Sequence, residues 1–260
     1  MKKFLTVLLL FIVSTSIALG DGLKKIEILG GWEKSDGSIV YGLKISLNEG
    51  WKTYWHTPGP FGFKPQFDFE GSLNISNLNV LWPSPKIFGS PSFETIGYEN
   101  EVILPIVIKA EVDSDPINLK IKGSIGICYD VCMPIEFEAQ SGLKIISKEI
   151  NTDLLAALAN LPLSPSDLGK KNARCSITFS PTGFKIGADI PYLEKASSSI
   201  FFSIMDYRSE LSIEQPKLYN PGKTLYAVGE WRDKTNLKIN GDLITITQLD
   251  EGRVIEQKGC

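Results

Sequence analysis

Residues 39–47 read IVYGLKISL, in which large apolar side chains at every second position alternate with small, polar or charged ones. This period of two is typical of a β-strand with one buried face, because successive side chains of a strand point to opposite sides. Turn-forming residues bracket the segment, Ser35-Asp36-Gly37 before it and Asn48-Glu49-Gly50 after it. The segment is therefore predicted to be one strand of an antiparallel sheet.

Further short strands are predicted on both sides of this segment, separated by stretches rich in Gly, Pro, Ser or Asn. They cover residues 26–29, 51–55, 73–81, 101–110, 117–127 and 133–140. Seven short strands without a long helix between them favour an antiparallel β-sandwich. The segment Pro83–Asn100 has no regular period and carries Phe88, Phe93 and Tyr98. It is predicted to be a long loop, either a functional lid or a plain connection between the sheets.

The pattern changes after Gly142. Asn151-Thr152-Asp153 is suited to cap a short helix that Pro162 would end, and residues 165–172 read as a linker. Short strands follow again at residues 175–179, 183–190, 199–205, 224–228 and 243–248. The sequence thus predicts an all-β chain in which a sandwich domain at residues 21–145 and a helix and linker at 146–172 precede a second, smaller β-sandwich-like domain at 173–260.

The first twenty residues have the three parts of a secretory signal. Lys2 and Lys3 precede an apolar run, and small and polar residues follow up to Gly20. An uncleaved membrane anchor is the alternative, but the apolar run is short for a bilayer span of about 20 residues. We expect cleavage near Gly20 and a mature protein that does not span the membrane. The protein would then be exported to an oxidising compartment, in which disulfides persist.

Charge and residue counts exclude several functions. The chain of 260 residues has 27 basic and 30 acidic side chains, a formal net charge of −3. This balance argues against nucleic acid as a partner. With His56 as the single histidine, a histidine-rich metal site or a serine–histidine–aspartate triad has little to be built from. The four cysteines are the better candidates for reactivity.

Cys128 and Cys132 are separated by Tyr129-Asp130-Val131, which differs from the two-residue spacing of thioredoxin-like motifs. If the strand that ends at Cys128 turns back through these residues, the two cysteines face each other across a hairpin at a distance suited to a disulfide. Ile127 and Met133 then point to the opposite, buried face.

Three interpretations of this pair follow from the residues. Because the pair closes only a small loop, it stabilises the fold less than a long-range bridge would, which favours a reactive disulfide over a stiffener of the hairpin. Asp130 is a candidate proton acceptor, or it raises the thiol pKa by charge repulsion. A copper or zinc site is the weakest interpretation, since Met133 is the only other soft ligand nearby.

Cys175 and Cys260 are candidates for a long-range structural disulfide, although Cys260 is alternatively a free thiol.

Several motifs resemble the amino-terminal periplasmic domain of the disulfide reductase DsbD, and particularly its copper-sensitivity-suppressor, ScsB-like relatives. They are listed here: Gly50-Trp51-Lys52-Thr53-Tyr54-Trp55, Pro58-Gly59, Trp82-Pro83-Ser84-Pro85, Gly97-Tyr98, Val102–Ile106 and Cys128–Pro134. The resemblance covers residues 25–140 well and the second half weakly.

The resemblance implies an immunoglobulin-like sandwich whose catalytic cysteines, Cys128 and Cys132, pass reducing equivalents from a membrane electron donor to exported thioredoxin-like or disulfide isomerase-like proteins. It also implies an aromatic cap loop that shields the pair, with Phe93 as first choice for the shielding ring, Phe88 as second, and Tyr98 in the same segment. The relatives are fused to a membrane domain and a thioredoxin-like domain, so here the donor is expected to be a separate protein.

No cofactor or resident metal is expected, His56 is interpreted as a surface or loop residue, and the location implied is the periplasm. Two functions from other classes remain open at this point. One is a non-catalytic immunoglobulin-like binding module with structural disulfides, and the other is a copper-handling protein.

Overall fold

The computed structural model describes residues 22–59, 61–89, 94–113, 115–141, 150–180, 183–191, 199–204, 212–213, 217–218, 224–230, 241–250 and 253–260. The expected signal sequence, residues 1–20, and Phe93 lie outside these residues. Among the described residues, no helix has the length and apolar character needed to cross a bilayer.

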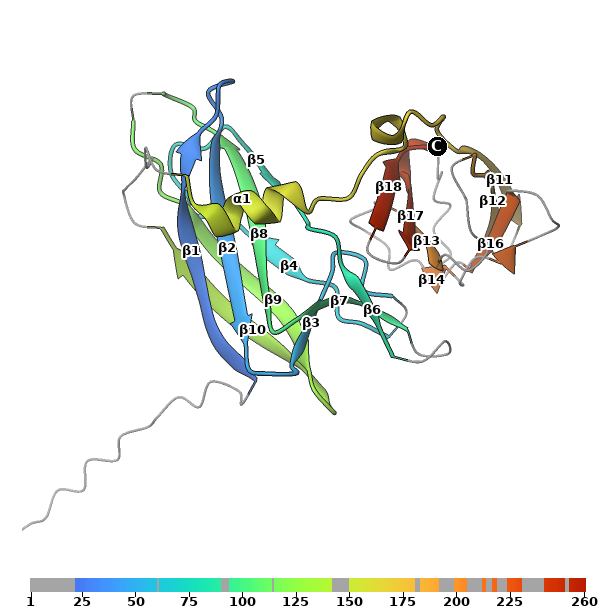
Figure 1. Ribbon diagram of the computed structural model, residues 1–260, viewed down its shortest axis with the longest axis horizontal. Helices are drawn as coiled ribbons and strands as arrows, with labels where there is room; N and C mark the ends of the chain where they lie inside the picture. The colour runs from blue at the N-terminus through green and yellow to red at the C-terminus, as the bar shows by residue number, and fades with distance from the viewer. Residues whose placement is uncertain are drawn as a thin grey trace, which may run out of the picture.

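The first part of the chain forms an immunoglobulin-like sandwich of two antiparallel sheets (Figure 1). One sheet has the strand order β1 (Leu23–Glu33), β2 (Ile39–Leu47), β8 (Glu101–Lys109), β5 (Asn77–Val80). The other has the order β10 (Cys132–Gln140), β9 (Lys120–Cys128), β3 (Lys52–Tyr54), β7 (Thr95–Glu99), β6 (Lys86–Phe88), and β4 (Gln66–Asp68) also pairs with β9. The core between the sheets includes Tyr41, Leu43, Trp55, Leu104 and Ile125, each at most 2 % exposed.

The central strand β2 is buried on both faces, whereas its alternation predicts one buried face. Helix α1 (Thr152–Ala159) accounts for the difference, because Leu154 packs on Val40 and Ile103 at the outer side of the sheet. Asn151 caps the helix by accepting hydrogen bonds from the backbone of Asp153 and Leu154, as the sequence predicts. The helix therefore packs on the first sandwich instead of forming part of a free linker.

The segment Pro83–Asn100 contains regular structure that the sequence pattern does not indicate. Strand β6 pairs with β7, and β7 pairs in turn with β3 in the middle of the second sheet. Both strands are short, so that neither shows enough alternation to be recognised, and the neighbouring strand β3 supplies the pairing that stabilises them. The prediction of a loop without regular structure over this whole segment is thus wrong.

The second part of the chain also consists of two sheets, and it follows a short 3-10 helix at Pro165–Leu168. One sheet has the order β11 (Arg174–Ser180), β12 (Gly183–Asp189), β16 (Thr224–Glu230), β14 (Ser212–Ile213), with β15 (Lys217–Leu218) also on β16. The other has the order β13 (Ser199–Ile204), β17 (Ile244–Asp250), β18 (Arg253–Lys258), with a 3-10 turn at Gly241–Leu243 before β17. Ile186, Ala188, Ile244 and Ile246 form the centre of its core.

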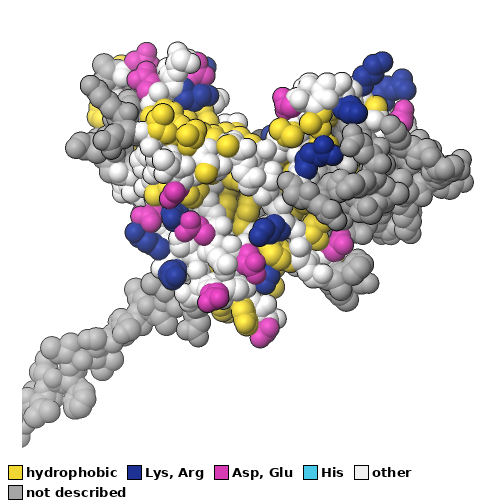
Figure 2. Space-filling model, in the orientation of Figure 1, with side chains coloured by type: hydrophobic (Ala, Val, Ile, Leu, Met, Phe, Trp, Pro, Cys, Tyr) yellow, Lys and Arg dark blue, Asp and Glu magenta, His cyan; other side chains and the backbone are white. Residues whose placement is uncertain are grey.

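The last two strands also contact the first sandwich. Leu249 of β17 and Val254 of β18 belong to the same cluster of buried apolar side chains as the first core. Glu256 of β18 accepts a hydrogen bond of 3.1 Å from His56, which lies shortly after the end of β3. Over the described surface in Figure 2, acidic and basic side chains lie intermixed, in keeping with the small net charge of the chain.

Candidate functional site

The hairpin of β9 and β10 brings Cys128 and Cys132 together in the predicted register. Cys132 lies opposite Cys128, Met133 opposite Ile127, and Pro134 opposite Gly126. The two cysteines form a disulfide, and their Cα atoms are 4.1 Å apart. This separation is closer to that of a non-hydrogen-bonded antiparallel pair, about 4.5 Å, than to the 5.5 Å or so of a hydrogen-bonded one. Pro134 is compatible with this strand because β10 is at the edge of its sheet.

Alternation along the hairpin separates the disulfide from the core. Ile127 is fully buried in the core, and Met133 packs against it from the facing strand. The cysteines point to the outer face of the sheet, where their exposure differs. Cys128 is only 8 % exposed, whereas Cys132 is exposed. Cys132 is therefore the more accessible of the two residues to an incoming thiol, whereas Cys128 is largely covered.

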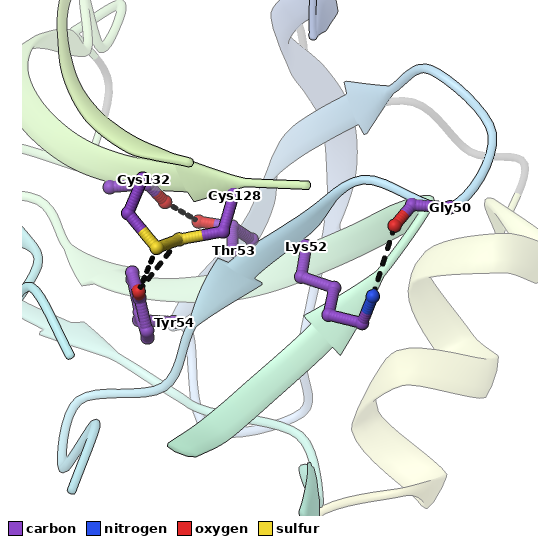
Figure 3. Close-up of a disulfide and its surroundings, with 7 residues drawn as sticks. Gly50, Lys52, Thr53, Tyr54, Cys128 and Cys132 are labelled. Carbon is purple, nitrogen blue, oxygen red and sulfur yellow. Dashed lines mark hydrogen bonds between the residues drawn. A yellow bond between two sulfur atoms is a disulfide. The ribbon is translucent and has the colours of Figure 1, made fainter. Parts of the chain in front are cut away.

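Tyr54 of β3 donates its hydroxyl to the two sulfurs, at 2.7 Å from Sγ of Cys128 and 3.1 Å from Sγ of Cys132 (Figure 3). Because both sulfurs are bonded to each other, the phenol is the donor in each contact. Burial raises the pKa of Tyr54 above its ordinary value, which keeps the hydroxyl proton in place at neutral pH. The disulfide thus has a protonated donor built in beside it.

Neighbouring residues fix the position of this tyrosine. Thr53 donates its hydroxyl to the carbonyl oxygen of Gly126 at 2.9 Å, which ties β3 to β9 beside the disulfide. Gly126 has no room for a side chain, since a Cβ atom there would lie 2.6 Å from Cβ of Phe63 and 2.7 Å from the ring of Tyr54. Phe63 also lies beside Tyr54, with ring centroids 6.2 Å apart. The sequence motif at residues 50–55 contains Tyr54 but gives it no role at the site, and Phe63 belongs to no motif, because the pairing of β3 with β9 is not visible in the chain.

The turn between the cysteines projects into solvent. Tyr129 is 57 % and Val131 70 % exposed, and Asp130 between them is exposed as well. The ring of Tyr129 also packs near Trp51, at a centroid distance of 5.9 Å. Apolar side chains therefore border the accessible sulfur, and Asp130 stays a candidate proton acceptor at the tip of the hairpin.

The aromatic residues expected in a cap lie in different places. Phe93 is outside the described residues. Phe88 is half-buried at the end of β6, with its ring 5.4 Å from the ammonium of Lys52. Tyr98 is buried in the core between the sheets and donates its hydroxyl to the carbonyl oxygen of Pro83. Because it lies opposite Thr53 in the β3–β7 register, Tyr98 faces the interior rather than the disulfide.

The remaining sequence candidates are away from this site. Cys175 and Cys260 form a second disulfide, with 85 residues of sequence separation, which is partly buried and packs against the core of the second part of the chain. His56 lies in the bend after β3, as a loop residue, and is half-buried beside Trp55 and Trp82 with a hydrogen bond to Glu256, away from the disulfide site. Within the described residues, no group of three or more His, Cys, Asp or Glu side chains is arranged to hold a metal ion.

Two comparisons relate this geometry to known proteins. Residues 31–142 match the family model described as thiol:disulfide interchange protein DsbD, N-terminal. The fold is similar to the crystal structure of the N-terminal periplasmic domain of ScsB from Proteus mirabilis, with a TM-score of 0.58 and 21 % sequence identity over 94 % of this chain and 96 % of that one. No curated protein sequence matches the chain. The expected resemblance is therefore confirmed for the first sandwich: residues 31–142 are similar to the N-terminal domain of DsbD, and the fold is similar to that of the N-terminal domain of ScsB.

Proposed function

We propose that the chain is an exported thiol-disulfide interchange protein of the protein-disulfide reductase type. In this proposal the Cys128/Cys132 pair takes reducing equivalents from a separate membrane electron-transfer protein and passes them to exported thioredoxin-like or disulfide isomerase-like proteins in the periplasm. The observation that carries the proposal is the unequal exposure of the two disulfide-bonded residues, Cys132 exposed and Cys128 buried, beside a hydroxyl donor that reaches both sulfurs. The match of residues 31–142 to a thiol-disulfide interchange family supports it.

The reaction proceeds by two thiolate attacks. A thiolate of the reduced donor attacks Sγ of Cys132, the Cys128–Cys132 bond breaks, and its electron pair leaves on Sγ of Cys128 as a mixed disulfide forms between the donor and Cys132. The second thiolate of the donor then attacks the donor sulfur of this mixed disulfide and releases Cys132. The donor dithiol is oxidised to a disulfide, and the pair in this chain is reduced by two electrons and takes up two protons.

The reduced pair reverses these roles toward an oxidised acceptor. Cys132 attacks the acceptor disulfide as a thiolate, and Cys128 resolves the mixed disulfide by attacking Sγ of Cys132. The hydroxyl of Tyr54 lies within hydrogen-bond distance of both sulfurs, so it can stabilise negative charge on either one as the bond opens and closes. The bordering side chains of Tyr129 and Val131 offer apolar contact to the partner protein.

Trapping of mixed disulfides tests the proposal. In Cys128→Ser, the exposed Cys132 stays and lacks its resolving partner, so we expect it to capture an exported thioredoxin-like protein as a complex that a strong reductant releases. Cys132→Ser keeps only the buried sulfur and is expected to capture far less. Cys175→Ser is the control, because it frees a thiol in the second part of the chain. Absence of any complex with Cys128→Ser, in the presence of oxidised thioredoxin-like protein, would refute the relay.

Reduction of the native protein separates this function from that of a binding module. A disulfide that only stiffens the hairpin resists a thioredoxin-like dithiol protein in the folded state, whereas an exchange-active pair is reduced readily. Mass spectrometry after alkylation assigns the reduced pair, and the Cys175–Cys260 disulfide is an internal reference in the same molecule.

A further inference from the structure

A row of four functional side chains crosses the second sheet on its outer face. The strand registers place Cys132 opposite Cys128, Cys128 opposite Lys52, and Lys52 opposite Glu99. Paired residues in neighbouring strands point to the same face of a sheet. An accessible sulfur, a buried sulfur, an ammonium and a carboxylate therefore follow one another across β10, β9, β3 and β7.

Lys52 is held away from the sulfurs in the oxidised protein. Its ammonium donates to the carbonyl oxygen of Gly50 at 3.1 Å and lies 3.7 Å from the carboxylate of Glu99. Figure 3 shows the side chain directed toward Gly50, on the side away from the disulfide. These contacts are partly exposed, since the side chains of Lys52 and Glu99 are 31 % and 36 % accessible. A lysine in this position can exchange its contacts at little cost, because its stem is flexible and its surface ion pair contributes little.

Opening of the disulfide creates a reason for Lys52 to move. Attack on the exposed Cys132 leaves the electron pair on Cys128, which is 8 % exposed and poorly solvated. Burial disfavours a thiolate, and a neighbouring cation favours it. Tyr54 supplies one hydrogen bond, and Lys52 is the cationic side chain directly across the strand pair from Cys128.

We propose that Lys52 stabilises the thiolate of Cys128 when the disulfide opens, and that Glu99 opposes this effect by competing for the same ammonium. The inference rests on the proposed exchange function and adds to it the residue that makes Cys128 a good leaving group. Lys52 acts here as an electrostatic positioning residue, since it does not touch a sulfur in the oxidised protein.

The thiolate fraction of Cys128 tests the proposal directly. The full chain with Cys132→Ser and an intact Cys175–Cys260 disulfide has a single free thiol, whose ionisation is followed by ultraviolet absorbance of the thiolate against pH. In this background we expect Lys52→Met to lower the thiolate fraction near neutral pH by about threefold to tenfold. Glu99→Gln is expected to raise it, and Lys52→Arg to leave it close to that of the parent.

Opposite signs distinguish this role from a structural one, because loss of a stabilising ion pair would move Lys52→Met and Glu99→Gln in the same direction. Lys122→Met is the matched control. This lysine belongs to β9, the strand of Cys128, and lies six residues before it, opposite Glu138 and Asp68 in the strand registers. Equal effects of Lys52→Met and Lys122→Met, or the same sign for Lys52→Met and Glu99→Gln, would overturn the proposal.

The two proposals fail in different experiments. If the wild-type disulfide is not reduced by a thioredoxin-like protein, the exchange function fails, whereas the ionisation of Cys128 still reports on Lys52. If the wild type exchanges readily and Lys52→Met leaves both the thiolate fraction and the rate of reduction by dithiothreitol unchanged, the role of Lys52 fails and the exchange function stands.

Discussion

Replacement of Tyr54 by phenylalanine removes the hydroxyl that both sulfurs share and leaves the ring in place beside Phe63. A hydrogen bond to a charged group contributes about 1.5–3 kcal/mol, and one between neutral groups about 0.5–1.5 kcal/mol. The variant loses the larger contribution when Cys128 is a thiolate, and the smaller one when Cys128 is a thiol or part of the disulfide. The difference, about 1–1.5 kcal/mol, corresponds to a loss of about fivefold to tenfold in thiolate population.

The assay is the rate at which a dithiol reduces the Cys128–Cys132 disulfide, measured near neutral pH by alkylation and mass spectrometry. We expect Tyr54→Phe to be reduced more slowly by the same factor, with the pH dependence of the rate displaced upward. The melting temperature should fall by only a few degrees, because the substitution keeps the ring and removes a hydrogen bond between neutral groups from the oxidised protein. A variant that is reduced at the wild-type rate over the whole pH range would refute the assignment of Tyr54 as donor to the leaving sulfur.

Three further predictions concern packing, pH and the second disulfide. Gly126→Ala places a Cβ atom against Phe63 and Tyr54. We therefore expect a loss of about 1–3 kcal/mol in the free energy of unfolding and slower thiol-disulfide exchange at Cys128–Cys132. Gly30→Ala is the neutral control, because a Cβ atom there has nothing within 4 Å. Burial raises the pKa of Glu256, but His56 and Lys258 outweigh it and hold the pKa below its ordinary 4.5. Its stabilising contribution is present above that value and disappears as the pH falls through the lowered pKa, so the difference in melting temperature between wild type and Glu256→Gln should vanish in acid. Replacing both Cys175 and Cys260 by serine opens a bridge over 85 residues and should cost the second part of the chain about 4–5 kcal/mol in calorimetric unfolding, with exchange at Cys128–Cys132 unchanged.

The hairpin could be predicted in detail because its information is local. Alternation, the position of the turn and the need to bury Ile127 fix which residue faces which, and the structure has the same register. The limits of β2 were predicted to the residue for the same reason. A pattern of period two gives the limits of a single strand, although it does not show that α1 covers the second face of β2.

The site around the hairpin could not be predicted in the same way, because it depends on which strands become neighbours. Tyr54 reaches the sulfurs only because β3 lies beside β9, more than 70 residues further along the chain. Lys52 owes its place opposite Cys128 to the same pairing. Strand β7 is again stabilised by a distant strand, β3, and β6 pairs in turn with β7, which explains why a segment that reads as a loop is part of a sheet.

Long-range contacts also determine the environment of His56. The sequence offers nothing that connects it with Glu256, two hundred positions away, yet the two residues join the first sandwich to the last strand of the chain. Of the two tryptophan rings beside it, Trp55 is its neighbour in sequence, whereas Trp82 is brought to it by the fold.

The two disulfides place opposite demands on the maturation of the protein. Four cysteines permit three pairings, and the cell has to obtain the one in which Cys128 meets Cys132 and Cys175 meets Cys260. The first pair is four positions apart and meets as soon as a hairpin turns, whereas the second must wait until β18 has joined its sheet. Early closure of the local pair would leave Cys175 and Cys260 only each other as partners. The short spacing would thus protect the nascent chain from mispaired cysteines.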